Sequence, residues 1–160
     1  MKIIITYGIG EGITKKAAFD KALFDAGIGN FNLIKLSSII PPKSQIIVDK
    51  INWNDTKSYG DKLYVVISTC FAKIPKQKAW AGLGWIQEKK SGQGIFVEIN
   101  GFKKKVVQDQ IKNSLNSMIL YRNLDPKNYK KIRYKIVGVK CQEKLICGVV
   151  VAIFKRESWN

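Results

Sequence analysis

The stretch AGIGNFNLIKLSSIIPP, residues 26–42, carries the most informative local signals in this chain. Gly27 ends an alanine-rich helical pattern, because glycine readily takes the positive φ that a helix C-terminus needs. Residues 31–38 then alternate between apolar and polar side chains, which predicts a strand. The proline pair that follows stops this strand, since proline has no N–H to donate to a sheet. Two adjacent serines, Ser37 and Ser38, therefore stand at the end of a predicted strand.

On the N-terminal side of this stretch, residues 3–7 form a β-branched run that predicts a strand. Thr14 is the expected N-cap of a helix that continues to Ala26. The apolar side chains of that segment recur at helical spacing, at Ala18, Phe19, Ala22, Leu23 and Ala26. We expect the helix to pack this apolar face against a sheet.

Residues 8–12, GIGEG, predict a loop between that strand and the helix. The dinucleotide-binding pattern would need a glycine at position 13, where Ile13 stands, so this reading fails. A phosphate-binding loop is excluded as well, because the Gly-Lys-Ser/Thr sequence is missing. We expect the glycines to allow close backbone approach to a ligand or to a neighbouring chain.

On the C-terminal side, the pattern predicts more strands and one more helix. Residues 80–87 and 94–99 flank a turn sequence and predict a hairpin. Residues 103–121 carry apolar side chains at helical spacing and predict the second helix. The remaining strands are expected at residues 45–48, 63–72, 133–139 and 145–154. The last of these is almost wholly apolar, which favours a central place in a sheet. Two helices and seven or eight strands indicate an α+β domain with largely antiparallel sheets.

Composition excludes several classes of enzyme. The 160 residues include no histidine, so Ser-His-Asp and Cys-His nucleophile systems, His-ligated zinc and HExxH hydrolases are ruled out. Acid–base groups must then be carboxylates, lysines, tyrosines or cysteines. Three cysteines without a C-x-x-C pair argue against a disulfide framework, and we expect reduced, mostly buried thiols. The length favours a single domain, residues 1–160.

Charge and hydropathy bear on partners and location. The 28 Lys and Arg against 12 Asp and Glu give a net charge of +16, typical of a nucleic-acid or anionic-surface binder, or of a lysine-rich solvated surface. The signatures of RRM, KH, zinc-finger and basic-zipper domains are missing, so we do not expect specific nucleic-acid binding. The longest apolar stretch, residues 145–154, is too short to span a membrane. With no signal-peptide pattern at the N-terminus, we expect a cytoplasmic protein with no membrane association.

The sequence resembles the pyruvoyl-dependent arginine decarboxylase family along most of its length. Residues 26–42 are similar to the self-cleavage region of that family, and this is the most specific of the similarities. Residues 12–23 resemble its first helix, and residues 82–85 and 94–101 resemble its central hairpin. Residues 146–152, ICGVVVA, resemble its closing apolar strand.

The resemblance implies a four-layer α/β/β/α sandwich with largely antiparallel sheets. It also implies self-cleavage into a β chain of residues 1–37 and an α chain of residues 38–160. Ser38 Oγ attacks the Ser37 carbonyl to give an ester, elimination leaves dehydroalanine, and hydrolysis leaves a pyruvoyl group and ammonia. This covalent pyruvoyl group is the implied cofactor, with no metal and no pyridoxal phosphate. L-Arginine would form a Schiff base on it and lose CO2 to give agmatine.

The resemblance assigns roles to four further residues. Glu98 would donate the proton that the decarboxylated substrate needs, and Asn32 would assist self-cleavage by hydrogen bonding near the scissile carbonyl of Ser37. Asp20 would bind the substrate guanidinium, for which a carboxylate is the natural partner. Two other local acids, Asp25 and Glu11, are further candidates for substrate binding. The family also implies a homotrimer of αβ protomers with active sites shared between neighbours.

Lys16 and Ala17 depart from the pattern of the family's first helix, which puts details of substrate contact in doubt. A net charge of +16 is also a poor field for attracting cationic arginine. Two alternatives therefore stay open. One is a pyruvoyl decarboxylase of another amino acid. The other is an unprocessed homologue that acts as a basic module binding anions or nucleic acid, although such a module has no need of Asn32, Ser37, Ser38 and Glu98 together.

Overall fold

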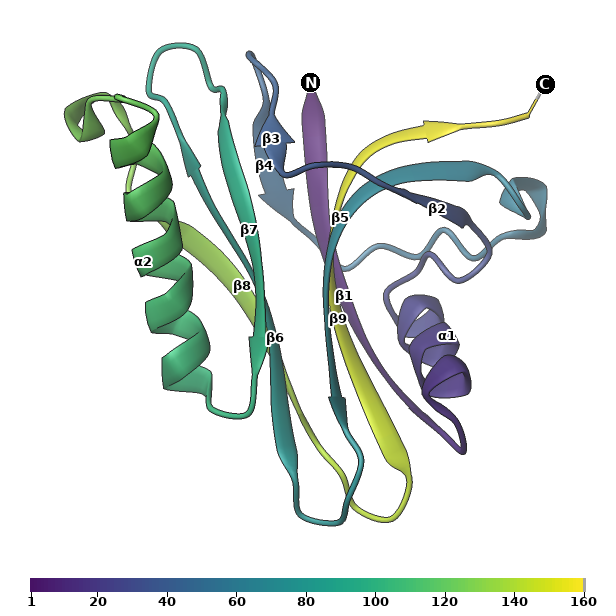
Figure 1. Ribbon diagram of the computed structural model, residues 1–160. Helices are drawn as coiled ribbons and strands as arrows, with labels where there is room; N and C mark the ends of the chain where they lie inside the picture. The colour runs from purple at the N-terminus through teal and green to yellow at the C-terminus, as the bar shows by residue number, and fades with distance from the viewer. Residues whose placement is uncertain (160) are drawn as a thin grey trace.

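The computed structural model describes residues 1–159, which form two sheets with one long helix on each outer face (Figure 1). The five-stranded sheet has the order β2-β5-β9-β1-β4, and the four-stranded sheet has the order β3-β7-β6-β8. The strands are β1 (Lys2–Gly12), β2 (Asn32–Lys35), β3 (Ile39–Ile40), β4 (Gln45–Val48), β5 (Lys62–Ala72), β6 (Lys78–Gln87), β7 (Gly94–Gly101), β8 (Arg133–Lys140) and β9 (Leu145–Glu157). The helices are α1 (Lys15–Asp25) and α2 (Lys104–Tyr121), with short 3-10 turns η1 (Thr56–Ser58) and η2 (Pro126–Asn128).

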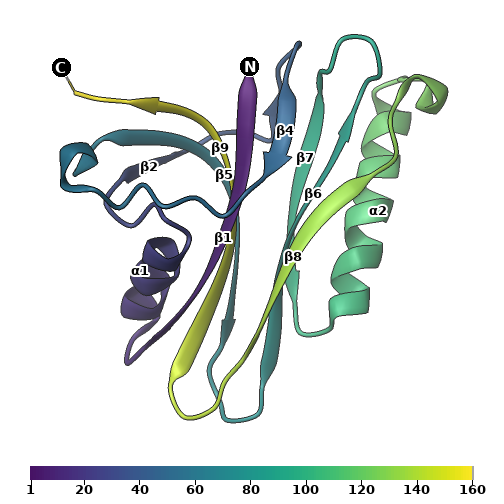
Figure 2. The same cartoon turned by 180° about the vertical axis from the view of Figure 1, so that it is seen from behind.

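The layer order is helix, sheet, sheet, helix, as Figures 1 and 2 show from opposite sides. Helix α1 lies on β1 and β9, and helix α2 lies on β6 and β7. Strand β9 is central in the five-stranded sheet, where it pairs antiparallel with β1 and β5. Only two pairs of strands, β1 with β4 and β2 with β5, are parallel in the described residues. The predicted sandwich, its largely antiparallel sheets and the central place of the last strand are confirmed.

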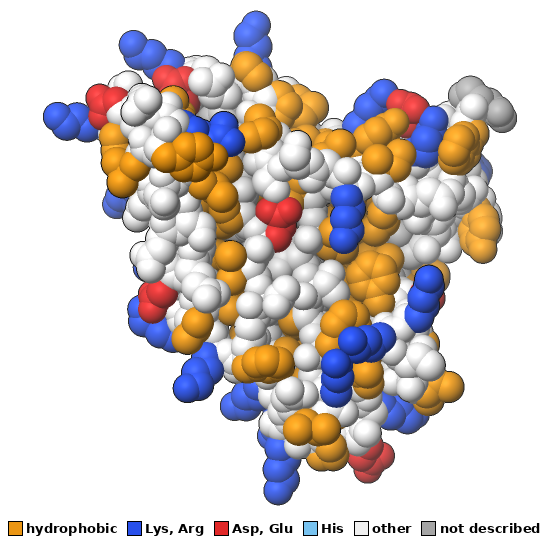
Figure 3. Space-filling model, in the orientation of Figure 1, with side chains coloured by type: hydrophobic (Ala, Val, Ile, Leu, Met, Phe, Trp, Pro, Cys, Tyr) orange, Lys and Arg blue, Asp and Glu red, His pale blue; other side chains and the backbone are white. Residues whose placement is uncertain are grey.

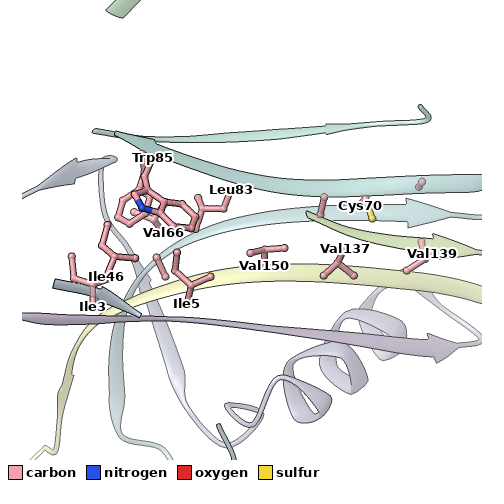
Figure 4. Packing of buried hydrophobic residues seen from close by; sticks show 14 of the residues in the cluster. Ile3, Ile5, Ile46, Val66, Cys70, Leu83, Trp85, Val137, Val139 and Val150 are labelled. Carbon is pink, nitrogen blue, oxygen red and sulfur yellow. The ribbon is translucent and has the colours of Figure 1, made fainter. Parts of the chain in front are cut away.

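The main core fills the space between the two sheets. Figure 4 shows side chains from facing strands meeting there, among them Ile5, Leu83 and Val150. Phe96 is fully buried in this layer, with its ring 6.2 Å from that of Trp85 and 5.9 Å from that of Phe154. Because strands alternate their side chains between faces, the opposite sides of the same strands are left to pack against the helices.

The helix signals found in the sequence are confirmed in detail. Thr14 Oγ1 accepts a hydrogen bond from the Ala17 N–H at 3.1 Å and so caps the start of α1. Gly27 follows the helix with a φ of 80°, the conformation in which glycine is favoured. None of the helices described in residues 1–159 is long and apolar enough to cross a membrane.

The predicted loop at residues 8–12 is wrong, because these residues continue β1 and pair with β9 as far as Leu145. Because their glycines have no side chain, the backbone of α1 can lie directly against this part of β1. A Cβ added at Gly10 would lie 2.3 Å from the Ala22 nitrogen, and one at Gly8 would lie 2.1 Å from the Ala22 oxygen. The close approach expected from the glycines is therefore made by the chain's own helix.

The strand predicted over residues 31–38 is shorter in the structure, where only residues 32–35 form a strand. This strand is β2, which pairs parallel with β5 in the five-stranded sheet. The chain then crosses to the other sheet, where β3 pairs antiparallel with β7. The alternation continues across the break because Leu36, between the two strands, packs into the core that both sheets share. The described residues thus form nine strands, and the short β3 at residues 39–40 was not among the predicted ones.

We expect Gly10→Ala to destabilise the fold by about 3 kcal/mol or more, because the added methyl group meets helix backbone that cannot move aside. Gly101→Ala is the matched control, since its Cβ would meet no backbone atom within 4 Å and only the Val107 side chain, at 3.3 Å, which has to shift by a few tenths of an ångström. Urea denaturation of both variants measures the difference. A loss below about 1 kcal/mol for Gly10→Ala would contradict the close packing of α1 on β1.

Candidate functional site

The two serines lie in the short crossing between β2 and β3. The Ile39 N–H donates to the Ser37 carbonyl oxygen at 2.8 Å, which closes a three-residue turn with Ser38 at its centre. The Ser38 carbonyl oxygen accepts from the Phe96 N–H on β7, also at 2.8 Å. The backbone of the serine pair is therefore fixed on both sides, although Ser37 is exposed and Ser38 is only partly buried.

Glu98 is the partner of the Ser38 side chain. Ser38 Oγ donates to Glu98 Oε2 at 2.6 Å, across 60 residues of sequence. Such a short distance is typical of a hydroxyl that donates to a carboxylate. Strand β7 sets the geometry, because Glu98 follows the buried Phe96 by two residues and so extends from the same face of the strand. A hydroxyl and a carboxylate from two of the suggested site residues thus lie in contact.

These residues line a pocket of about 310 Å³ at the edge of the four-stranded sheet. Besides the serines and Glu98, three residues from α2 and its C-terminal end contribute to the wall: Ser114, Met118 and Arg122. Sequence reasoning missed all three. The helix was predicted, but its spacing did not reveal which strand it would lie beside, and Arg122 falls just past its predicted end. The charged residues that line this pocket, within the described chain, are Glu98 and Arg122.

Asn32 and Asp20 do not contact the serine pair in this chain. The Asn32 side-chain amide donates to the Gly60 carbonyl oxygen at 2.6 Å, at the start of β2. Asp20 lies exposed on α1, on the outer face of the five-stranded sheet, whereas the pocket lies beside α2. Of the five site residues suggested by the sequence, the chain brings together Ser37, Ser38 and Glu98.

The two further acids suggested as substrate ligands have other positions. Asp25 accepts from the Ile9 N–H at 2.9 Å and forms an ion pair with Lys50 at 3.1 Å, so it caps the part of the β1 edge that β4 does not cover. Glu11 lies exposed on β1 itself. The departures from the family pattern, Lys16 and Ala17, are exposed on α1.

The cysteines are three buried, free thiols, as expected. Burial raises the pKa of Cys147 to about 12 and that of Cys70 to about 11, so both stay protonated at neutral pH. Among residues 1–159 there is no group of three or more Cys, Asp or Glu placed to hold a metal ion. Of the acid–base groups that the sequence left open, the carboxylate of Glu98 is the one beside the serine pair.

The surface around the site is basic and apolar. Figure 3 shows Lys and Arg side chains spread over this face, with few acidic ones and several exposed hydrophobic patches between them. Ile39, next to the serine pair, is 47% exposed. An exposed apolar rim of this kind is typical of a surface that another molecule covers.

Comparison with known proteins gives a consistent result. The family model described as pyruvoyl-dependent arginine decarboxylase (PvlArgDC) matches residues 2–158. The pyruvoyl-dependent arginine decarboxylase of Pyrococcus horikoshii is 32% identical over 156 residues, which cover 94% of each chain. That of Pyrococcus furiosus is 30% identical over 155 residues, again 94% of each chain.

Two further similarities are more limited. The pyruvoyl-dependent arginine decarboxylase of Methanothermobacter thermautotrophicus is 57% identical over 47 residues, 29% of this chain and 31% of that one. A solved structure of a pyruvoyl-dependent histidine decarboxylase has a TM-score of 0.42 and 12% identity, over 88% of this chain and 61% of that chain.

Proposed function

Because this chain belongs to the pyruvoyl-dependent arginine decarboxylase family, we propose that it cleaves itself between Ser37 and Ser38 and then decarboxylates L-arginine to agmatine and CO2. The observation that carries the proposal is the hydrogen bond from Ser38 Oγ to the Glu98 carboxylate. Cleavage would leave a β chain of residues 1–37 and an α chain of residues 38–160, with a pyruvoyl group at the start of the α chain.

In self-cleavage, Glu98 acts as the general base. It accepts the Ser38 Oγ proton as that oxygen attacks the Ser37 carbonyl carbon. The C–N bond between the serines breaks, an ester bond to Oγ forms, and the nitrogen of residue 38 takes up a proton. Loss of the Cα proton of residue 38 then expels the Ser37 carboxylate and leaves dehydroalanine. Its imine tautomer reacts with water to give the pyruvoyl group and ammonia, with no net oxidation or reduction.

The Ile39 N–H stabilises the negative charge that develops in the first step. It already donates to the Ser37 carbonyl oxygen at 2.8 Å, the oxygen that becomes an oxyanion when Oγ attacks. The Phe96 N–H holds the Ser38 carbonyl in the same way from β7. These two hydrogen bonds hold the carbonyl groups on both sides of the Ser38 Cα, so Oγ meets a Ser37 carbonyl group that cannot turn away.

The pyruvoyl group supplies the carbonyl that takes the substrate amine and the electron sink for decarboxylation. The protein then has to protonate the substrate Cα, and Glu98, beside residue 38, is placed to hold that proton. Arg122 lines the same pocket and offers a cation to the α-carboxylate of the incoming amino acid. Asn32 acts as a positioning residue, because its bond to Gly60 fixes the start of the strand that leads to Ser37.

The guanidinium of arginine needs a carboxylate, and Asp20 is the residue proposed for it. Asp20 lies on the other side of the five-stranded sheet from the Ser38 pocket, so one chain cannot supply both. We therefore propose a homotrimer of αβ protomers in which Asp20 of one protomer completes the pocket of its neighbour. The open pocket and the exposed Ile39 beside it support a surface that a second copy covers. The three free thiols fit a reducing compartment, such as the cytoplasm.

We expect the processed protein to release CO2 from L-arginine with agmatine as the product, measured by mass spectrometry across a panel with L-lysine, L-ornithine and L-histidine. A site built for bidentate guanidinium binding should give kcat/KM for arginine about 100-fold or more above lysine. Faster turnover of another amino acid would assign the chain to that substrate. No turnover, with strongly salt-dependent binding to nucleic acid, would favour the basic binding module instead.

Mixing two inactive variants tests the shared site. We expect Asp20→Ala to process itself but turn over arginine poorly, and Glu98→Gln to keep Asp20 while lacking its own proton carrier. Co-expressed, the two should form mixed oligomers in which a processed Ser38 faces an intact Asp20, and activity should return in part. Asp20→Ala combined with Glu98→Gln in one chain is the control, since its mixture with Asp20→Ala restores nothing. Absence of any recovery in confirmed mixed oligomers would place Asp20 outside the neighbour's pocket.

A further inference from the structure

A polar hollow of about 410 Å³ lies between β4 and β8, at the edge of the two sheets opposite to the one that holds the Ser38 pocket. Three cations line it: Lys130, Lys131 and Arg133. The wall is completed by Ser44, Gln45, Ile46, Trp85 and Gln87. It shares no residue with the wall of the Ser38 pocket, and no Asp or Glu of residues 1–159 belongs to its lining. The hollow is therefore basic and separate from the proposed decarboxylase site.

Ser44 has an unsatisfied side chain in this wall. It is 8% exposed, and its Oγ is buried with no hydrogen-bond partner, the one such side-chain atom found in the described part of the chain. Leaving a buried hydroxyl without a partner is unfavourable. Ser44 belongs to the wall of the hollow, and rotation about its Cα–Cβ bond would turn the hydroxyl toward an acceptor bound there, which would satisfy it.

The groups around Ser44 are held in place by buried contacts. Gln87, which is 7% exposed, donates through Nε2 to the Ser44 carbonyl oxygen at 2.9 Å and to the Gly92 carbonyl oxygen at 2.6 Å. The Arg133 guanidinium lies 5.4 Å from the centre of the buried Trp85 ring. The Lys130 N–H donates to the Gln87 carbonyl oxygen at 2.8 Å. The backbone of Ser44 and at least one cation are thus positioned before any ligand arrives.

We propose that this hollow binds the phosphate group of a small molecule. Three cations and a hydroxyl donor suit a compact dianion whose oxygens are all hydrogen-bond acceptors. A single carboxylate would leave most of the positive charge uncompensated. The volume exceeds what a phosphate ion alone occupies, so the hollow also has room for a small organic group attached to it. This site gives part of the +16 charge a function that does not depend on arginine decarboxylation.

Titration calorimetry of the full chain with inorganic phosphate, at low and constant ionic strength, tests the proposal. We expect one saturable site. Arg133→Gln should weaken binding about ten-fold or more, and Ser44→Ala about five-fold, since it removes one hydrogen bond. The double variant Lys130→Gln with Lys131→Gln should weaken phosphate binding strongly. Lys140→Gln with Lys144→Gln removes the same charge outside the hollow and should leave the affinity unchanged.

Thermal unfolding without phosphate gives a second readout. Ser44→Ala should be as stable as the unmodified chain, or more stable, because it removes a buried hydroxyl that has no partner. Stability retained with affinity lost separates a ligand-binding role from a structural one. A parallel titration with glucose 6-phosphate identifies the source of the phosphate: tighter binding than inorganic phosphate assigns the site to a phosphomonoester, and equal binding assigns it to the free ion.

The proposal is overturned if the unmodified chain shows no saturable phosphate binding, or if Ser44→Ala and Arg133→Gln bind phosphate as tightly as it does. It is overturned as well if the control pair Lys140→Gln with Lys144→Gln weakens binding as much as the pair at 130 and 131, because the effect would then come from overall charge.

Discussion

Residues 36–38 carry the chain from the five-stranded sheet to the four-stranded sheet, and the arrangement of the serine pair depends on how short this crossing is. Leu36 still donates to Val65 of the first sheet, and Ser38 already accepts from Phe96 of the second. Only Ser37 lies between these two attachments. A peptide held from both sides can keep the tight turn in which the Ile39 N–H reaches back to the Ser37 carbonyl oxygen.

The same constraint brings a hydroxyl and a carboxylate together. Because β3 pairs with β7 in a fixed register, Ile39 lies opposite Ile95, and the side chain of Ser38 falls within reach of Glu98. The register of β7 is itself set by the burial of Phe96 between the sheets. Packing of the core therefore positions Ser38 and Glu98 through the strands that carry them, and these side chains need few further contacts.

Local signals predicted much of the fold because they act over short distances in the sequence. A few neighbouring residues were enough to predict the Thr14 cap, the helix end at Gly27 and the central apolar strand. Where the prediction failed, a distant partner decided the structure. Residues 8–12 form a strand because β9 pairs with them, and their glycines serve α1. The sequence did not reveal that β2 ends at Lys35. Leu36 packs into the core that both sheets share, so the apolar alternation continues past the end of the strand.

The site itself was predicted mainly by resemblance, since two serines at a strand end carry little information alone. The structure adds two features that residue spacing in the sequence cannot predict. These are the hydrogen bond between Ser38 and Glu98 and the part of the pocket wall that α2 supplies. Asn32 and Asp20 lie apart from the pocket in a single chain, so their proposed roles depend on how copies of the chain assemble.

The most direct test of the central claim is the intact mass under denaturing conditions, followed over time, for the unmodified chain, Ser38→Ala, Glu98→Gln and the control Asp109→Asn. The unmodified chain and Asp109→Asn should each separate into two fragments at the bond between residues 37 and 38. Ser38→Ala should stay a single chain. Glu98→Gln should cleave at least about 100-fold more slowly than the unmodified chain, because its amide cannot accept the Oγ proton. An unmodified chain that stays whole, or a Glu98→Gln variant that cleaves at the unmodified rate, would contradict the role assigned to the hydrogen bond between Ser38 and Glu98.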